Sequence, residues 1–319
     1  MDKLIEDVIP EVDRDLLLSE LTEDKFLRHS GKGGNHLYLV NHKNSPNVVR
    51  EIGRLREITF REAGGGTGKS MDIDSYDTSD VPYMQLISWD PEEKEIIAGY
   101  RLLKCIHANK DDNGQIITAT SHLFHLSDKF NEEYLSATLE LGRSFVQPKY
   151  QSKNPKGIFS LDNLWDGLGA VSRLNPDIKY YLGKVTMYPD YNREARNLIL
   201  SFVSQFFPDD IGIGTPLYPL IKGEEIAKLD LLKPLWIGKS YKEGHTILNK
   251  KVRELGENIP PLINSYMNLT DTMKTFGTSI NPNFGDVEET GILVTIEDLH
   301  PSKKQRYFDS YEAFKDFKR

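Results

Sequence analysis

Six charged residues stand out because their types and spacing could perform chemistry. They form an acidic run followed by charges within two apolar segments, and they are Asp72, Asp74, Asp77, Arg101, Glu140 and Arg143. Charged side chains in buried strands are costly unless they are paired, so the arginines and the glutamate require partners, which the aspartates could supply. Two interpretations remain open, a structural ion-pair network and a site in which a carboxylate acts as a general base.

The elements that must position these charges follow from hydrophobic periodicity. Residues 47–62 have apolar side chains at helical spacing, which predicts an amphipathic helix. The stretch 83–103 predicts an antiparallel hairpin around the turn "DPEEKE". A further strand at 138–146 contains Glu140 and Arg143 three positions apart, which places their side chains on opposite faces unless a bulge lies between them.

The rest of the chain completes a mixed α/β (α+β) pattern with mainly antiparallel strands. We expect helical segments at residues 3–30, 131–136, 161–174 and 192–207, and strands at 35–40, 115–126, 179–188 and 290–296. The segment 115–126 is predicted to pair with 138–146, and residues 208–245 look like an irregular, proline-rich insertion. The predicted organisation is an N-terminal extension (1–46), one domain (47–300) and a C-terminal tail (301–319).

Composition excludes several classes of protein. A chain of 319 residues with 38% hydrophobic content can bury a sizeable core, while a net charge of -8 argues against a general nucleic-acid binder. The single cysteine, Cys105, excludes an intrachain disulfide framework and a cysteine-rich zinc site, and His122 and His125 lack further ligands at metal-binding spacing. The start has no secretory signal pattern and no apolar run reaches membrane-spanning length, which predicts a cytoplasmic protein without a metal.

The glycine-rich stretch "AGGGTGKS", residues 63–70, matches a loose phosphate-loop pattern. A working phosphate loop requires a buried strand before it and a helix after it, whose amides and lysine hold the phosphates. Here a charged amphipathic helix precedes the loop, and "MDIDSYD" follows it. We expect a flexible turn or lid, and nucleotide binding through Lys69 and Ser70 is the alternative.

Five landmarks occur in the order found in one enzyme family. They are Arg56 and Phe60 in "RLREITF", the acidic "DIDSYD", Arg101 in "GYRLL", Glu140 with Arg143 in "ELGRSFV", and "LDNLWDGL". In this order the sequence resembles the acyl-carrier-protein-dependent GNAT N-acyltransferases. These are the ornithine and glycine N-acyltransferases of lipid biosynthesis, often labelled hemolysin-like, and more distantly the acyl-homoserine-lactone synthases. The glycine-rich insertion is most similar to the glycine-acylating members.

The resemblance implies a GNAT-type fold and an N-acyltransferase that binds no cofactor. The donor would be an acyl-phosphopantetheine thioester on acyl carrier protein, less readily acyl-CoA, and the acceptor the amine of glycine or ornithine. The transferred group would be long-chain and could carry a 3-hydroxyl. A lipid product would bring a peripheral encounter with the membrane. The enzymatic alternative is a CoA-dependent acetyltransferase, and a non-catalytic carrier-binding protein is another.

The implied site has three groups of residues. Glu140 is the expected base, with Arg101 and Arg143 beside it; the donor-binding residues are Arg56, Phe60, Ser144, Phe145, Val146, Lys149 and Lys153; Asp72, Asp74 and Asp77 order the lid or bind the acceptor. A backbone amide between Ser144 and Val146 would hold the oxyanion of the tetrahedral intermediate. For the aspartates we favour the structural role, because carboxylates paired with arginine stay ionised and are poor bases.

Overall fold

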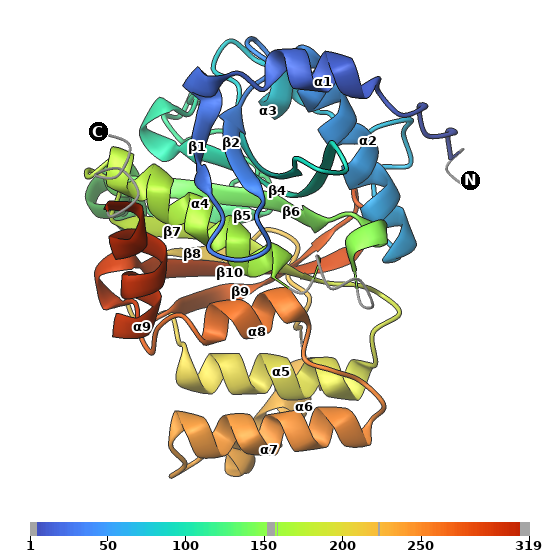
Figure 1. Cartoon of the computed structure of the whole chain (residues 1–319). Helices are drawn as coiled ribbons and strands as arrows, with labels where there is room; N and C mark the ends of the chain where they lie inside the picture. The colour runs from blue at the N-terminus through green and yellow to red at the C-terminus, as the bar shows by residue number, and fades with distance from the viewer. Residues whose placement is uncertain (1–4, 152–156, 158, 223, 313–319) are drawn as a thin grey trace. The chain divides into compact units, whose positions relative to one another are not determined.

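The computed structural model describes residues 5–151, 157, 159–222 and 224–312 (Figure 1). Contacts within the chain divide it into two compact units. Unit 1 is drawn from Met1–Thr118, Ala137–Lys179 and His300–Arg319, and unit 2 from Ala119–Ser136 and Tyr180–Leu299. The division predicted from the sequence, with boundaries after residues 46 and 300, stays a prediction.

Unit 1 contains five antiparallel strands in the order β1-β2-β3-β4-β6. Their bounds are β1 (Phe26–His29), β2 (His36–Val40), β3 (Met84–Asp90), β4 (Glu95–Lys104) and β6 (Thr138–Val146). β3 and β4 form the expected hairpin, with Met84 opposite Leu102. Nearly every residue of these two strands is buried, so both faces of the hairpin are covered.

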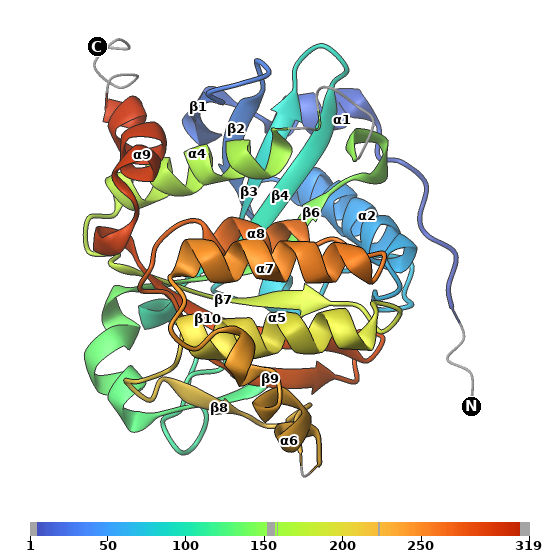
Figure 2. The ribbon, with the colours of Figure 1, turned by 90° about the horizontal axis from the view of Figure 1, so that it is seen from below.

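The described residues of unit 1 also form five α-helices, of which α2 and α4 pack on its strands. They are α1 (Arg14–Glu20), α2 (Pro46–Glu62), α3 (Ser75–Thr78), α4 (Ser160–Leu174) and α9 (Pro301–Lys304). α4 crosses β1 to β4, and Leu86 of β3 lies against Gly167 of α4 (Figure 2). The carboxylate of Glu20 accepts hydrogen bonds from the amides of Asn47 and Val48, and so satisfies free donors at the start of α2.

The last described residues return to unit 1. α9 continues into a single π-helical turn, η8 (Gln305–Asp309), which packs on α4. Tyr307 stacks on Trp165 with ring centroids 6.1 Å apart, and its hydroxyl donates to Asp162 at 2.7 Å. Arg173 near the end of α4 pairs with Asp309 at 2.9 Å. Residues far apart in the sequence therefore complete one core.

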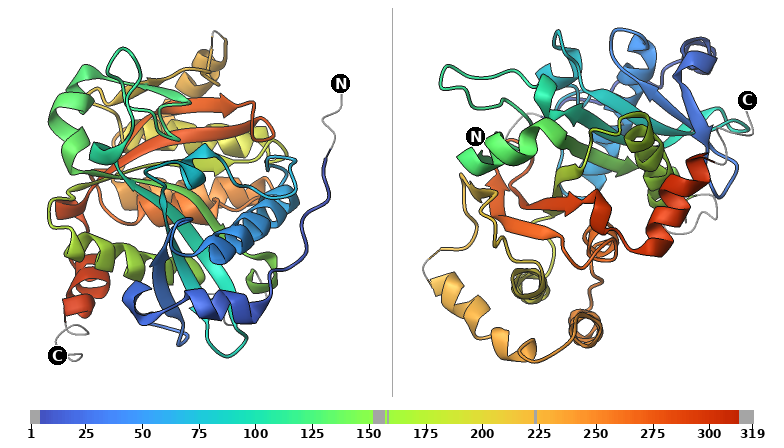
Figure 3. Two further views of the ribbon diagram at one scale, coloured as in Figure 1. Left: turned by 90° about the horizontal axis from the view of Figure 1, so that it is seen from above. Right: turned by 90° about the vertical axis from the view of Figure 1, so that its left-hand side faces the viewer.

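The described residues of unit 2 form two sets of antiparallel strands and four α-helices. Its strands are β7 (Tyr180–Met187), β10 (Val287–Thr295) and β9 (Lys274–Asn281), paired in that order, and the separate pair β5 (Phe124–Leu126) and β8 (Gly214–Pro216). Its helices are α5 (Arg193–Phe206), α6 (Glu224–Asp230), α7 (Tyr241–Glu254) and α8 (Pro261–Met267). Both α6 and α7 pack against α5 (Figure 3).

Two local predictions are wrong, and one strand was missed, for physical reasons. Within the described residues 5–30, the helical spacing produces α1 and one 3-10 turn, because Phe26 joins an aromatic cluster with His36 and Tyr38 that holds β1 in the sheet. Residues 115–126 form only the short β5, paired with β8 instead of β6, because the chain turns at Thr120. Strand β9 was not expected, since its sequence "KTFGTSIN" has no apolar alternation.

Among the described residues, no helix is both long and apolar enough to cross a membrane. The cytoplasmic location expected from the sequence stays a prediction.

Candidate active site

A β-bulge on β6 resolves the geometry of Glu140 and Arg143. Gly99 pairs with Phe145 and Arg101 with Gly142, so two residues of β6, Arg143 and Ser144, oppose one residue of β4. Arg143 adopts a left-handed conformation with φ 49°, which is unusual for a residue other than glycine. The extra residue resets the alternation of side chains, and Arg143 turns toward the side of the sheet that carries Arg101.

The structure joins the three arginines and three aspartates into one arginine–aspartate cluster. Arg56 bonds Asp72 (Nε to Oδ2, 3.1 Å) and Asp77 (Nη2 to Oδ2, 3.0 Å). Arg101 Nη1 lies 2.8 Å from both carboxylate oxygens of Asp74 and 3.3 Å from Oδ2 of Asp77. Arg143 Nε lies 2.9 Å from Oδ2 of Asp72, and the formal charges of the cluster cancel.

Burial and pairing act in opposite directions on the ionisation of this cluster. Burial raises the pKa of Asp77, but Arg56 and Arg101 outweigh it and hold the pKa well below the ordinary value. The pKa of Asp72 is also lowered, because Arg143 and Arg56 outweigh the rise that burial causes. Burial lowers the pKa of Arg101 and its aspartates raise it, with a net rise. Asp72 and Asp77 are therefore poor proton acceptors at neutral pH.

Local structure explains how the acidic run reaches the arginines. The carboxylate of Asp74 accepts from the amides of Tyr76 and Asp77 and caps α3, and Asp77 bonds back to the amide of Asp74. Upstream, the amide of Asp72 donates to the carbonyl of Gly53 at 2.9 Å. A Cβ at Gly53 would lie 2.6 Å from Ile73, so glycine lets this strand-like segment lie directly on α2.

Glu140 lies beside the cluster and binds a tyrosine that sequence reasoning missed. It is 1% exposed, and the hydroxyl of Tyr83 donates a hydrogen bond to its Oε2. The guanidinium of Arg101 lies 5.0 Å from the ring centroid of Tyr83. Arg101 forms ion pairs with Asp74 and Asp77, and Arg143 forms one with Asp72. No sequence signal links residues 83 and 140, which face each other only across the sheet.

Two further residues complete the surroundings of the site. Gln85, opposite Arg101 on the neighbouring strand, donates to Oδ1 of Asp77 at 2.9 Å. Because Leu86 faces α4, its neighbour Gln85 points to the other face, where the cluster lies. Cys105 is fully buried, and burial followed by the charge of Glu140 raises the pKa of its thiol well above the ordinary value. The thiol stays protonated and is a weak nucleophile.

The glycine-rich loop does not have the geometry of a phosphate loop. Its amides at Thr67 and Gly68 donate to the buried carboxylate of Glu57, at 3.1 and 2.8 Å, and the amide of Ser70 donates to Glu6 at 2.8 Å. The carboxylates occupy the donors that a phosphate would need. Helix α2 precedes the loop, and the four-residue α3 follows it. The loop is a structural turn closed on Glu57.

The residues expected to bind the donor lie in different surroundings. Phe60 on α2 and Phe145 on β6 are buried, at 7% and 3% exposure, while Ser144 and Val146 are half-buried in or next to the bulge. Lys149 is exposed and pairs with Glu95 at 2.8 Å. Lys153 lies outside the described residues.

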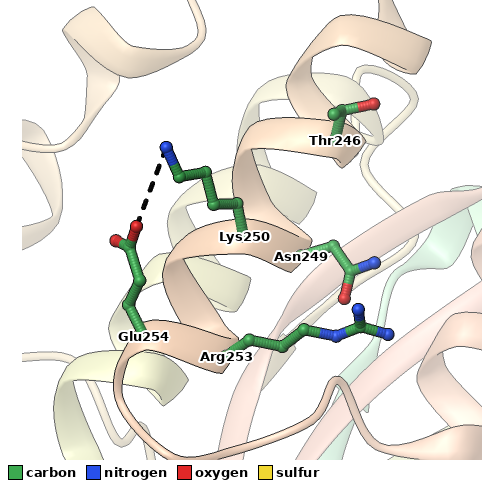
Figure 4. Close-up of a pocket in the computed structure, with 5 residues that line it drawn as sticks. All are labelled: Thr246, Asn249, Lys250, Arg253 and Glu254. Atoms are coloured by element: carbon green, nitrogen blue, oxygen red, sulfur yellow. Dashed lines mark ion pairs between the residues drawn. The ribbon is translucent and has the colours of Figure 1, made fainter.

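Other sequence candidates do not form a second centre. Within the described part of the chain, no group of three or more potential ligands could hold a metal, and His122 contacts Asn283 at 3.2 Å. A pocket on the outer side of α7 contains an ion pair between Lys250 and Glu254, 3.8 Å apart (Figure 4). It belongs to unit 2 and does not include Glu140, which lies in unit 1.

Comparison with known proteins assigns the class of the protein. Residues 55–158 match the family described as an acetyltransferase (GNAT) domain, and the antiparallel strands flanked by helices are consistent with a GNAT-type fold. The predicted fold class and acyltransferase activity are thus confirmed.

Relatives then narrow the family. The chain is 52% identical over 309 residues to a glycine N(alpha)-acyltransferase of Bacteroides thetaiotaomicron, with 96% of this chain and 91% of the relative covered. It is 49% identical to a glycine N(alpha)-acyltransferase of Phocaeicola vulgatus, with 96% and 94% covered. The chain belongs to this family of N-acyltransferases. A CoA-dependent acyl-homoserine lactone synthase, BjaI, solved with SAM and isopentyl-CoA, matches with 12% identity and a TM-score of 0.38 over 88% of this chain and 90% of that one.

Proposed function

We propose that the protein transfers a long-chain acyl group, which can carry a 3-hydroxyl, from acyl carrier protein to the amine of glycine. The choice of glycine as the acceptor is supported by the name glycine N(alpha)-acyltransferase, which is shared by two relatives about half identical to this chain over nearly its whole length. The product would be an N-acylglycine, a lipid or lipid precursor. The carrier rather than coenzyme A follows from the family resemblance and from the lysines after β6, of which Lys149 is exposed.

In the proposed reaction Glu140 accepts a proton from the ammonium group of glycine, directly or through water. The freed lone pair attacks the thioester carbonyl carbon, and a carbon–nitrogen bond forms. A backbone amide between Ser144 and Val146, next to the bulge, would hold the oxyanion. The carbon–sulfur bond then breaks, and the nitrogen gives its second proton to the departing sulfur, directly or through water, which leaves the amide and the free thiol of phosphopantetheine; Glu140 returns the first proton to water.

The electrostatics of the site support Glu140 over the other carboxylates as the base. Asp72 and Asp77 are held ionised by arginines and have lowered pKa values. Glu140 instead accepts a hydrogen bond from the neutral hydroxyl of Tyr83. We assign the arginine–aspartate cluster to shaping this site, with Arg101 and Arg143 fixing the strand and the bulge beside Glu140.

The test combines thiol release with mass spectrometry. Purified protein is incubated with long-chain acyl carrier protein or the matching acyl-CoA, each with glycine, ornithine or a pool of amino acids. We expect free thiol and N-acylglycine with the carrier donor. Glu140→Gln keeps the size of the side chain and should lower kcat by about a hundredfold to ten-thousandfold.

Glu289→Gln provides a matched control, because Glu289 is also a buried strand carboxylate, 4% exposed, but belongs to unit 2. It should retain activity. Thiol release from acyl-CoA alone would overturn the carrier assignment, and ornithine acylation without glycine acylation would overturn the acceptor. Thiol release with neither donor would leave a non-catalytic carrier-binding protein as the better account.

A further inference from the structure

Unit 2 exposes large apolar side chains in the stretch 226–242, which we call the α6–α7 segment. Ile226 is 51% exposed, Leu231 79% and Ile237 65%. Leu231 is the most exposed of the large hydrophobic side chains among the described residues. Single exposed apolar residues are ordinary, but three within twelve positions of one segment make it a candidate for an interaction surface.

The segment is anchored from beneath, so these side chains are held outward. Trp236 is 1% exposed, its Nε1 donates to Ser201 of α5 at 2.9 Å, and its ring meets Phe202 edge to face with centroids 5.4 Å apart. Its neighbour Ile237 is 65% exposed and faces solvent. Gly238 follows with φ 72° and turns the chain toward α7.

The charge of this segment is opposite to that of the whole chain. From the start of α6 to the end of α7, residues 224–254, six lysines and one arginine stand against five acidic residues, Glu224, Glu225, Asp230, Glu243 and Glu254. Lysines 228, 233, 239 and 242 lie in the α6–α7 segment, where Asp230 pairs with Lys233 at 2.8 Å. All four lysines are exposed. The chain as a whole carries a net charge of -8, so a positive local surface is a departure that favours an anionic partner.

Helix α7 continues this basic surface. Gly244, Leu248 and Val252 form its buried stripe, and helical spacing puts Lys242, Thr246, Lys250 and Arg253 on a different stripe. The last three line the shallow pocket of Figure 4, where the Lys250 amine leans toward Glu254 and Arg253 extends separately. Cationic and hydroxyl donors on one helix face are suited to phosphate groups.

We propose that the α6–α7 segment docks the enzyme on an anionic phospholipid bilayer. Leu231 and Ile237 would enter the boundary between headgroups and acyl chains, while the lysines contact headgroup phosphates. A bilayer is favoured over an acidic protein as the partner because the side chains of Leu231 and Ile237 protrude from the surface. Apolar contacts of protein interfaces are strongest in well-packed, enclosed pockets, whereas a fluid bilayer needs no matching shape. That the bilayer also receives the acylglycine rests on the function proposed above.

Vesicle flotation with the full chain tests the proposal. Vesicles of phosphatidylcholine alone are compared with vesicles that also contain phosphatidylglycerol. The apolar variant combines Leu231→Ser with Ile237→Ser, and its control combines Ile106→Ser with Ile117→Ser, which are 50% and 44% exposed in unit 1. The charge variant combines Lys239→Glu with Lys242→Glu, and its control uses two exposed lysines of unit 1, Lys110→Glu with Lys179→Glu.

We expect wild-type protein to float with the anionic vesicles only, and salt to weaken binding. Both segment variants should lose at least about tenfold in partition, and both controls should float like wild type. Unchanged melting curves would establish that the variants fold. Absence of flotation, or equal flotation of all variants, would overturn the proposal.

Activity is measured separately with soluble glycine and purified carrier donor, without vesicles. If the segment variants lose activity there through a raised Michaelis constant for the carrier, the surface binds the carrier protein and the bilayer assignment is wrong. Flotation without any acylglycine would refute the proposed function and keep the docking surface. The two proposals can therefore fail independently.

Discussion

Replacing Asp77 with asparagine tests whether the arginine–aspartate cluster is structural. The carboxylate of Asp77 accepts from Arg56 at 3.3 and 3.0 Å, from Arg101 at 3.3 Å, from Gln85 at 2.9 Å and from the amide of Asp74 at 3.1 Å. An asparagine keeps the shape but turns one acceptor into a donor that faces other donors. It also leaves two buried arginines short of one negative charge.

We expect Asp77→Asn to lower the free energy of unfolding by about 3–5 kcal/mol, the usual cost of breaking a buried ion pair from one side. Urea unfolding followed by tryptophan fluorescence would measure it. The control is Asp74→Asn, whose side chain is 29% exposed and whose amide can still cap α3, so it should cost about 1 kcal/mol.

The free energy of unfolding should also depend on pH. Because the pKa of Asp77 and that of Asp72 are lowered in the folded state, the unfolded chain binds more protons in acid, and stability rises with pH. Their contribution is present above about pH 4 and disappears as the pH falls through the folded pKa values. Asp77→Asn should flatten this slope. Normal stability together with a raised Michaelis constant for glycine would refute the structural role and favour acceptor binding.

Three further variants probe the surroundings of the site. Tyr83→Phe removes the hydroxyl that donates to Glu140 and should lower kcat with little change in melting temperature, whereas a purely structural role would lower the melting temperature and leave kcat of the folded enzyme unchanged. Glu57→Gln should loosen the glycine-rich loop, so we expect faster proteolysis within the loop and no ATP binding by the variant. ATP binding by the wild-type protein would contradict the structural role of the loop. Gly99→Ala places a methyl group 2.8 Å from the ring of Phe145 and should displace the strand beside the bulge. We expect kcat to fall clearly while the melting temperature changes little; an unchanged kcat would show that the strand adapts.

Much of unit 1 could be predicted because local pattern and tertiary packing agree. The periodic helix α2 and the β3–β4 hairpin form where expected. The pairing of the aspartates with the arginines could be predicted because buried charges require partners of opposite sign. The bulge could not be predicted, since nothing in "ELGRSFV" signals a positive φ at Arg143. The partner of Glu140 was also inaccessible, because Tyr83 is 57 residues away and meets it only after the strands are in register.

The return of η8 to α4 has a consequence for biosynthesis. Unit 1 takes residues from both sides of the segment 180–299 that makes most of unit 2, so its core cannot close until that segment has been translated. Trp165 remains without its stacking partner Tyr307 for more than a hundred residues of synthesis. All residues of unit 2, by contrast, have been synthesised once Leu299 is reached. The half of the enzyme that carries Glu140 is thus the last to be completed on the ribosome.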